Sequence, residues 1–145
     1  MFEKLFMLVK NNAGTAVINN PVIADKDRDA VMIEASSSII EVLKYQMESG
    51  KLNDLINFFK YSGIYSATLI SSMVNRFANK LNNFYNVEFE AAHNISAMLI
   101  PGVLQQLVAQ SKSGEEADFA PGYLLSSLNG EGKDLSPMID RLMVA

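Results

Sequence analysis

Residues 91–111 form the most apolar continuous segment of the chain, and their pattern predicts a helix in the core. Its apolar side chains recur at steps of three and four residues, as on one face of a helix: Ile95, Met98, Leu99, Val103, Leu107 and Val108. Ile100 and Leu104 widen this stripe beyond a single face. A helix that is apolar almost all round is buried, so we expect the other helices to cover this one.

A proline interrupts this apolar stretch at Pro101, directly before Gly102. Proline lacks a backbone donor and crowds the preceding turn, so the pattern predicts a division into two helices. The first is expected to run from Glu88 to Met98, and the second to begin at Ile100, because proline is tolerated in a first turn. The residues expected to be most deeply buried are Leu99, Val103, Leu104, Leu107 and Val108.

Helical spacing of apolar residues also recurs along most of the remaining chain. It predicts further helices over residues 2–11, 27–49, 52–61, 64–83 and 121–128, and a last helix from residue 136 onward. Gly50 is typical of the position just after a helix, and Ser136-Pro137 is typical of a helix start. No long alternation of apolar and polar residues indicates a strand. The sequence therefore predicts an all-α protein with six to eight helices and buried central helices.

The length of 145 residues predicts one domain, because a chain of this size buries enough surface to support a core. We expect three parts within it. Residues 1–20 form a short helix and a connector, residues 21–112 form the helical core, and residues 113–145 form short helices at the C-terminal end.

Composition and charge narrow the classes of partner. The net charge of −4 argues against a nucleic-acid surface, which needs clustered Lys and Arg. No apolar run approaches the roughly 18–20 residues that span a bilayer, and residues 1–10 lack the features of a signal peptide. The absence of cysteine excludes a disulfide framework and fits a reducing compartment, so we expect a cytoplasmic protein.

Residues 2–11 form an amphipathic pattern with two interpretations. Phe2, Leu5, Phe6 and Val9 share one face of the predicted helix. The helix could lie on a membrane surface, or it could pack onto the core. The polar face is not distinctly basic and the helix is short, so packing onto the core is favoured and a membrane-surface partner is not expected.

The residues that could carry chemistry are few. His93 is the only histidine, and it follows Glu90 at the spacing of helical di-metal carboxylate proteins, but those proteins need that motif twice. We therefore expect no metal, no cofactor and no catalytic residue. A pocket beside the predicted helix break remains an alternative, with Glu88, Glu90, His93 and Pro101 as its candidate residues.

Two stretches carry a resemblance to a known family. Residues 49–59 read SGKLNDLINFF, and residues 74–108 contain a helix ending in Lys-Leu, a short cap, and an apolar helix with one proline. In this pattern residues 39–111 resemble the YidB-like family of bacterial proteins of unknown function. Asn86-Val87 stands where that family usually has Gly-Leu. The resemblance implies a multihelical fold with buried central helices, and it implies no activity.

These observations favour a non-enzymatic helical module that binds a protein partner or itself. Phe58, Tyr61 and Tyr85 are expected on the surface, where they could form an apolar patch. One alternative is a small-ligand binder or enzyme with its pocket near Pro101. The other is peripheral membrane association through residues 2–11.

Overall fold

The computed structural model describes residues 2–61, 64–114, 117–128 and 134–144. In these ranges seven α-helices follow one another: α1 (Phe2–Asn12), α2 (Arg28–Glu48), α3 (Leu52–Lys60), α4 (Ile64–Phe84), α5 (Phe89–Ser113), α6 (Pro121–Ser127) and α7 (Ser136–Val144). One π-helical turn, η1 (Gly14–Ile18), and two 3-10 turns, η2 (Asp25–Asp27) and η3 (Ala117–Phe119), lie between them. The described ranges contain no strand, so the predicted all-α fold is confirmed.

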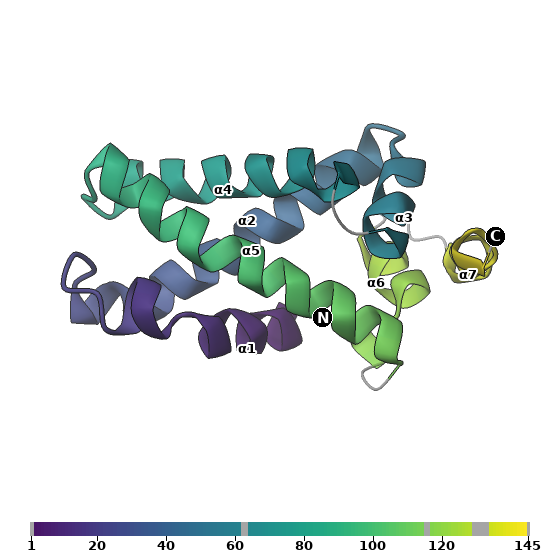
Figure 1. Ribbon diagram of the computed structural model, residues 1–145, viewed down its shortest axis with the longest axis horizontal. Coiled ribbons are helices and arrows are strands. Elements are labelled where there is room, and N and C mark those ends of the chain that lie inside the picture. Colours follow the sequence, from purple (N-terminus) through teal and green to yellow (C-terminus); the bar gives the residue numbers. More distant parts are fainter. Residues whose placement is uncertain (1, 62–63, 115–116, 129–133, 145) are drawn as a thin grey trace.

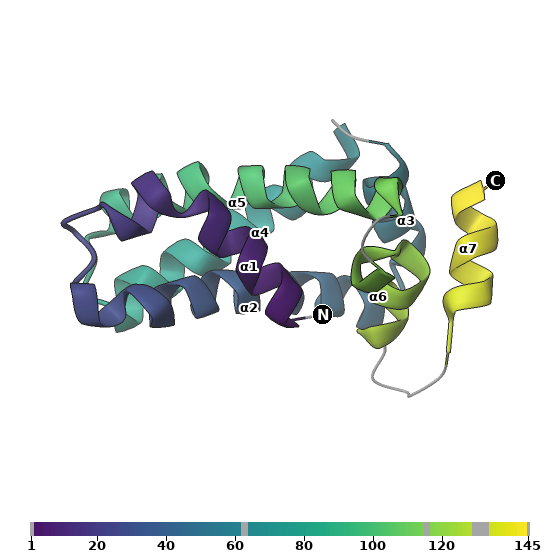
Figure 2. The ribbon, with the colours of Figure 1, turned by 90° about the horizontal axis from the view of Figure 1, so that it is seen from below.

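The helices α1, α2, α4 and α5 build the body of the molecule, and α5 is the central one (Figure 1). Figure 1 shows α5 crossing the front, with α4 on one side and α1 on the other. Seen from below, in Figure 2, α2 lies on the side opposite to α5. The helices α3, α6 and α7 gather at one end, where the C-terminus also lies (Figures 1 and 2). The inner face of α5 is therefore covered from several sides.

The core forms where α5 meets its neighbours. Leu99, Val103, Leu104 and Leu107 are at most 1 % exposed, which confirms their predicted burial. Each fully buried side chain of this kind contributes roughly 1.5–3 kcal/mol relative to an exposed one. Val108 is only half-buried, so its predicted place among the most buried residues is wrong. It lies beside an open hollow described below.

The helix α5 runs without a break through Pro101, so the predicted division into two helices is wrong. Proline removes the hydrogen bond that the carbonyl group of Ala97 would accept. Both Ala97 and Pro101 are exposed, so the lost bond falls on the side of the helix that faces away from the core. Leu99 and Val103, on either side of the proline, are buried in the same core. The packing of both halves of α5 in the core therefore keeps the helix continuous at Pro101, where the sequence alone predicts an end.

The start of α5 is set by a side-chain cap. The carboxylate of Glu88 accepts hydrogen bonds from the backbone N–H groups of Glu90 (3.2 Å) and Ala91 (3.3 Å). These bonds satisfy two of the donors that a helix start leaves free, and the negative charge favours the positive end of the helix. The predicted start near Glu88 is confirmed, with the first helical residue at Phe89.

The helix α1 packs onto α5 as well as onto α2, through Leu5, Leu8 and Val9. Asn12 donates a hydrogen bond from its Nδ2 atom to Oε1 of Gln106 in α5 (3.0 Å). A side chain at Gly102 would place its Cβ atom 3.2 Å from Oδ1 of Asn12. The absence of a side chain at Gly102 therefore lets the two helices approach closely.

Candidate functional site

An open apolar hollow of about 450 Å³ lies beside Pro101. Its walls come from α3, α4 and α5, and the residues that line it are Phe58, Ile70, Pro101, Leu104, Gln105, Val108, Ala109 and Lys112. Apolar side chains form most of this lining, and Gln105 and Lys112 supply one amide group and one cation. The hollow is suited to an apolar group, with an anion or a hydrogen-bonding group near Lys112.

Of the four pocket residues predicted from the sequence, only Pro101 lies at this hollow. Glu88 caps the start of α5, and Glu90 and His93 are exposed on the first turns of that helix. An α-helix rises about 1.5 Å per residue, which places His93 about 12 Å from Pro101 along the axis. These four residues are near one another in the sequence, but the continuous helix α5 places Glu88, Glu90 and His93 too far from Pro101 to form one site with it.

The three aromatic residues expected on the surface behave differently from one another. Tyr61 is 48 % exposed and Tyr85 is half-buried, whereas Phe58 is only 1 % exposed. Phe58 packs edge-on against Phe59, with ring centroids 5.1 Å apart. The expectation for Phe58 is therefore wrong, because α3 packs against α5 and Phe58 is part of the lining between the two helices.

The side of α5 that faces away from the core carries a continuous exposed strip, which we call the outer face of α5. It comprises Glu90, Asn94, Ala97, Met98, Pro101, Gln105, Val108, Ala109 and Lys112, all of them exposed except the half-buried Val108. The middle of the strip is mostly apolar, and Met98 is 56 % exposed there. Glu90 at one end and Lys112 at the other carry opposite charges. This face borders the hollow along the second half of the helix.

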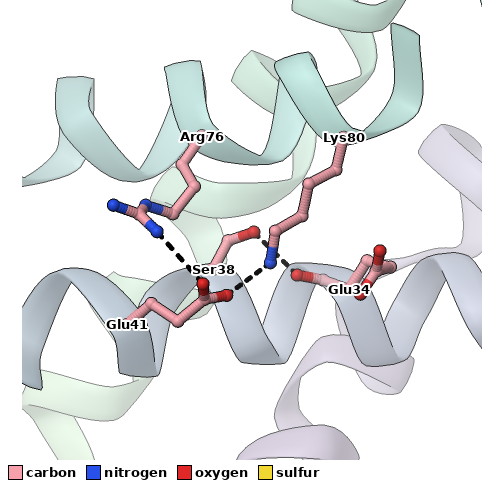
Figure 3. A network of polar contacts seen from close by, with 5 residues as sticks. All are labelled: Glu34, Ser38, Glu41, Arg76 and Lys80. Atoms are coloured by element: carbon pink, nitrogen blue, oxygen red, sulfur yellow. Dashed lines mark hydrogen bonds and ion pairs between the residues drawn. The ribbon is translucent and has the colours of Figure 1, made fainter. Parts of the chain in front are cut away.

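A second hollow, of about 520 Å³, lies between α2 and α4 and is polar. We call it the polar groove; its lining includes Tyr45, Asn75, Arg76, Asn79 and Lys80. At its edge the carboxylate of Glu41 pairs with Arg76 (3.0 Å) and with Lys80, as Figure 3 shows.

The ion pairs also shift the titration of Glu41. Partial burial acts to raise the pKa of this carboxyl group, but the hydrogen bond and charge of Lys80, together with the charge of Arg76, outweigh it. The net shift of the pKa is downward. Glu41 is therefore ionised at neutral pH and its charge is balanced within the molecule.

A third hollow, of about 420 Å³, lies at the start of α1, where Phe2, Met7 and Ile33 are exposed. These side chains form an apolar patch on the surface of α1 and α2.

Within the described ranges no helix is long and apolar enough to cross a membrane. The same ranges hold no group of three or more His, Asp or Glu side chains placed to bind a metal ion.

Comparison of the chain with protein-family models, with curated proteins and with solved structures finds no match. The resemblance of residues 39–111 to the YidB-like family therefore stays a prediction.

Proposed function

We propose that this chain is a non-enzymatic helical module that binds protein through the outer face of α5. The observation that supports this most is Met98, a large apolar side chain that is 56 % exposed in the middle of the central helix. Pro101 and the apolar hollow lie within one turn of it. An apolar surface of this kind, with polar residues at its ends, is typical of interaction sites.

The rigidity of α5 favours binding at this face. Leu99, Val103 and Leu107 anchor the inner face of the same helix in the core. The outer face is therefore already in one conformation before a partner arrives, and less entropy is lost on binding. Met98 adds an adaptable side chain that can fill an irregular partner surface.

The test compares Met98→Glu with a matched control, Tyr45→Glu, which places the same charge on an equally exposed residue of α2. The mass in solution and the proteins retained from a lysate are measured for both variants and for the unchanged chain. We expect an association that Met98→Glu abolishes and Tyr45→Glu preserves. A strictly monomeric chain that retains nothing, or an association that survives Met98→Glu, would contradict the proposal.

A second candidate function is the binding of a small amphiphile in the hollow beside Pro101. The apolar lining and the cation of Lys112 at its edge favour a ligand with a short hydrocarbon tail and a carboxylate. Titration with octanoate, followed by chemical shifts of the chain, tests this candidate. Ala109→Trp fills part of the hollow and should remove the shifts, whereas the absence of shifts at millimolar octanoate would rule the candidate out.

Peripheral membrane association is the remaining alternative. The exposure of Phe2 and Met7 is the observation that bears on it. Sedimentation with anionic liposomes, with the unchanged chain and with a Phe2→Ser/Met7→Ser variant, separates it from protein binding. A cytoplasmic location and the lack of affinity for nucleic acid also stay predictions.

A further inference from the structure

We propose that the outer face of α5 pairs with the same face of a second copy, with the two helices antiparallel and a two-fold axis at Pro101. This inference rests on the proposed protein-binding function and names the partner. In a two-fold interface the same surface is used by both copies, so it must be complementary to itself. The outer face of α5 meets this requirement in its charges, in its spacing and in its apolar centre.

The charges match only in the antiparallel arrangement. Glu90 lies eleven residues before Pro101 and Lys112 lies eleven residues after it. An antiparallel pair centred on Pro101 therefore places Glu90 of each copy opposite Lys112 of the other, twice in the dimer. A parallel pair would place each of these charges against its own kind, which is unfavourable.

The spacing fits the packing of two helices. The outer face presents residues at positions 90, 94, 97, 101, 105, 108 and 112. The steps between them alternate between three and four residues, except at Pro101, where two steps of four follow each other. This alternation is the pattern of helices that pack at a small crossing angle. The middle of this stripe holds Ala97 and Pro101, which lack long side chains, so the two backbones can approach closely at the axis.

Met98 adds an apolar contact beside the axis, where its side chain is 56 % exposed. It lies three residues before the axis, and the two-fold symmetry keeps the two Met98 residues on the same side of the pair, about 9 Å apart along the helix axes. These flexible side chains are therefore placed to meet across the axis.

Cysteine cross-linking tests the geometry, because the chain has no cysteine of its own. A cysteine at the axis, Pro101→Cys, meets its counterpart, and we expect a disulfide-linked dimer under mild oxidation. Ala109→Cys is the matched control on the same face. Its two copies would lie sixteen residues apart along the helices, about 24 Å, far beyond the roughly 7 Å that a disulfide spans. Cross-linking of Ala109→Cys as readily as Pro101→Cys would overturn the antiparallel arrangement.

A charge exchange tests the register. Glu90→Lys and Lys112→Glu each turn two attractive pairs into two repulsive ones, and we expect sedimentation equilibrium to show a dimer dissociation constant weakened about tenfold. The double variant Glu90→Lys/Lys112→Glu restores both pairs in the exchanged sense and should return the constant to within about threefold of the original. Glu48→Lys, on the exposed end of α2, is the control for net charge. Failure of the double variant to restore the dimer would contradict the pairing.

Different results would contradict pairing with a second copy and the wider protein-binding function. A chain that stays monomeric at every concentration overturns pairing with a second copy. The wider protein-binding function survives that result if the chain retains a different protein and Met98→Glu abolishes its retention. If Met98→Glu leaves every association intact, both proposals are wrong.

Discussion

The helices α4 and α5 pack against each other, and each buries one face in the same core, but their outer faces differ. The exposed side of α4 carries Asn75, Arg76, Asn79 and Lys80, and it borders the polar groove. The exposed side of α5 is mostly apolar in its middle, around Met98 and Pro101.

The difference lies in where the charges of each face find partners. Arg76 and Lys80 of α4 are balanced by Glu41 of α2 within the molecule. Glu90 and Lys112 of α5 are about 33 Å apart along the helix axis, so they cannot pair with each other. The charges of the α4 face are thus balanced within the molecule, whereas the outer face of α5 is the surface that we propose to be matched by a second copy.

The largest effects are expected where the two helices are alike, on their buried faces. Phe77→Ala in α4 and Leu99→Ala in α5 each remove a fully buried side chain. We expect a loss of about 3–5 kcal/mol in the free energy of unfolding for Phe77→Ala and about 2–5 kcal/mol for Leu99→Ala. Denaturant unfolding measures both. A loss below about 1 kcal/mol at either position would show that this face is not part of the core.

A smaller effect of opposite sign is expected at the exposed middle of α5. Pro101→Ala restores a backbone N–H that can donate to the carbonyl group of Ala97, inside a helix that is already continuous. We expect the free energy of unfolding to rise by about 1–3 kcal/mol. Gln105→Ala, on the same face, is the control and should change it by less than about 0.5 kcal/mol. A destabilised Pro101→Ala would mean that the proline ring makes a contact that the helix needs.

The smallest effect is expected at the polar groove. Glu41→Gln removes the charge shared by Arg76 and Lys80, and at pH 7 we expect a loss of about 0.2–1 kcal/mol, because solvent screens these partly exposed pairs. The folded pKa of Glu41 lies below its ordinary value of 4.5, so its stabilising contribution is complete above that value. The contribution is lost as the pH falls through the lowered pKa.

The measurement for this prediction is the difference in unfolding free energy between the unchanged chain and Glu41→Gln from pH 7 to pH 3. The difference should shrink below about pH 4.5. Glu48→Gln is the control at an exposed position of the same helix. A difference that grows on acidification would contradict the direction of the pKa shift.

Local spacing predicted the helices well because each long helix has one apolar stripe and a clear end signal. The expected range 27–49 corresponds to α2 (Arg28–Glu48), and the expected range 64–83 corresponds to α4 (Ile64–Phe84). Gly50, with φ of 75°, follows α2 as predicted, because glycine tolerates this left-handed conformation.

The continuity of α5 through Pro101 and the composition of the site could not be predicted in the same way, because both depend on contacts between distant residues. The rule for proline counts the lost donor at Pro101, but not the shared core that holds Leu99 and Val103 on either side. The hollow joins Phe58, Ile70 and Leu104 from three helices, and no spacing along the chain brings these residues together. The prediction instead collected Glu88 and His93, which are near Pro101 only in sequence.

The contact between α1 and α5 has a consequence for the order of folding. The hydrogen bond from Asn12 to Gln106 joins residues 94 positions apart, whereas α4 and α5 are consecutive in the chain. Closing a long loop costs more entropy and is slower than forming a helical hairpin between neighbours. We therefore expect the α4–α5 hairpin to form early, and α1 to dock last onto a surface that the hairpin has already built.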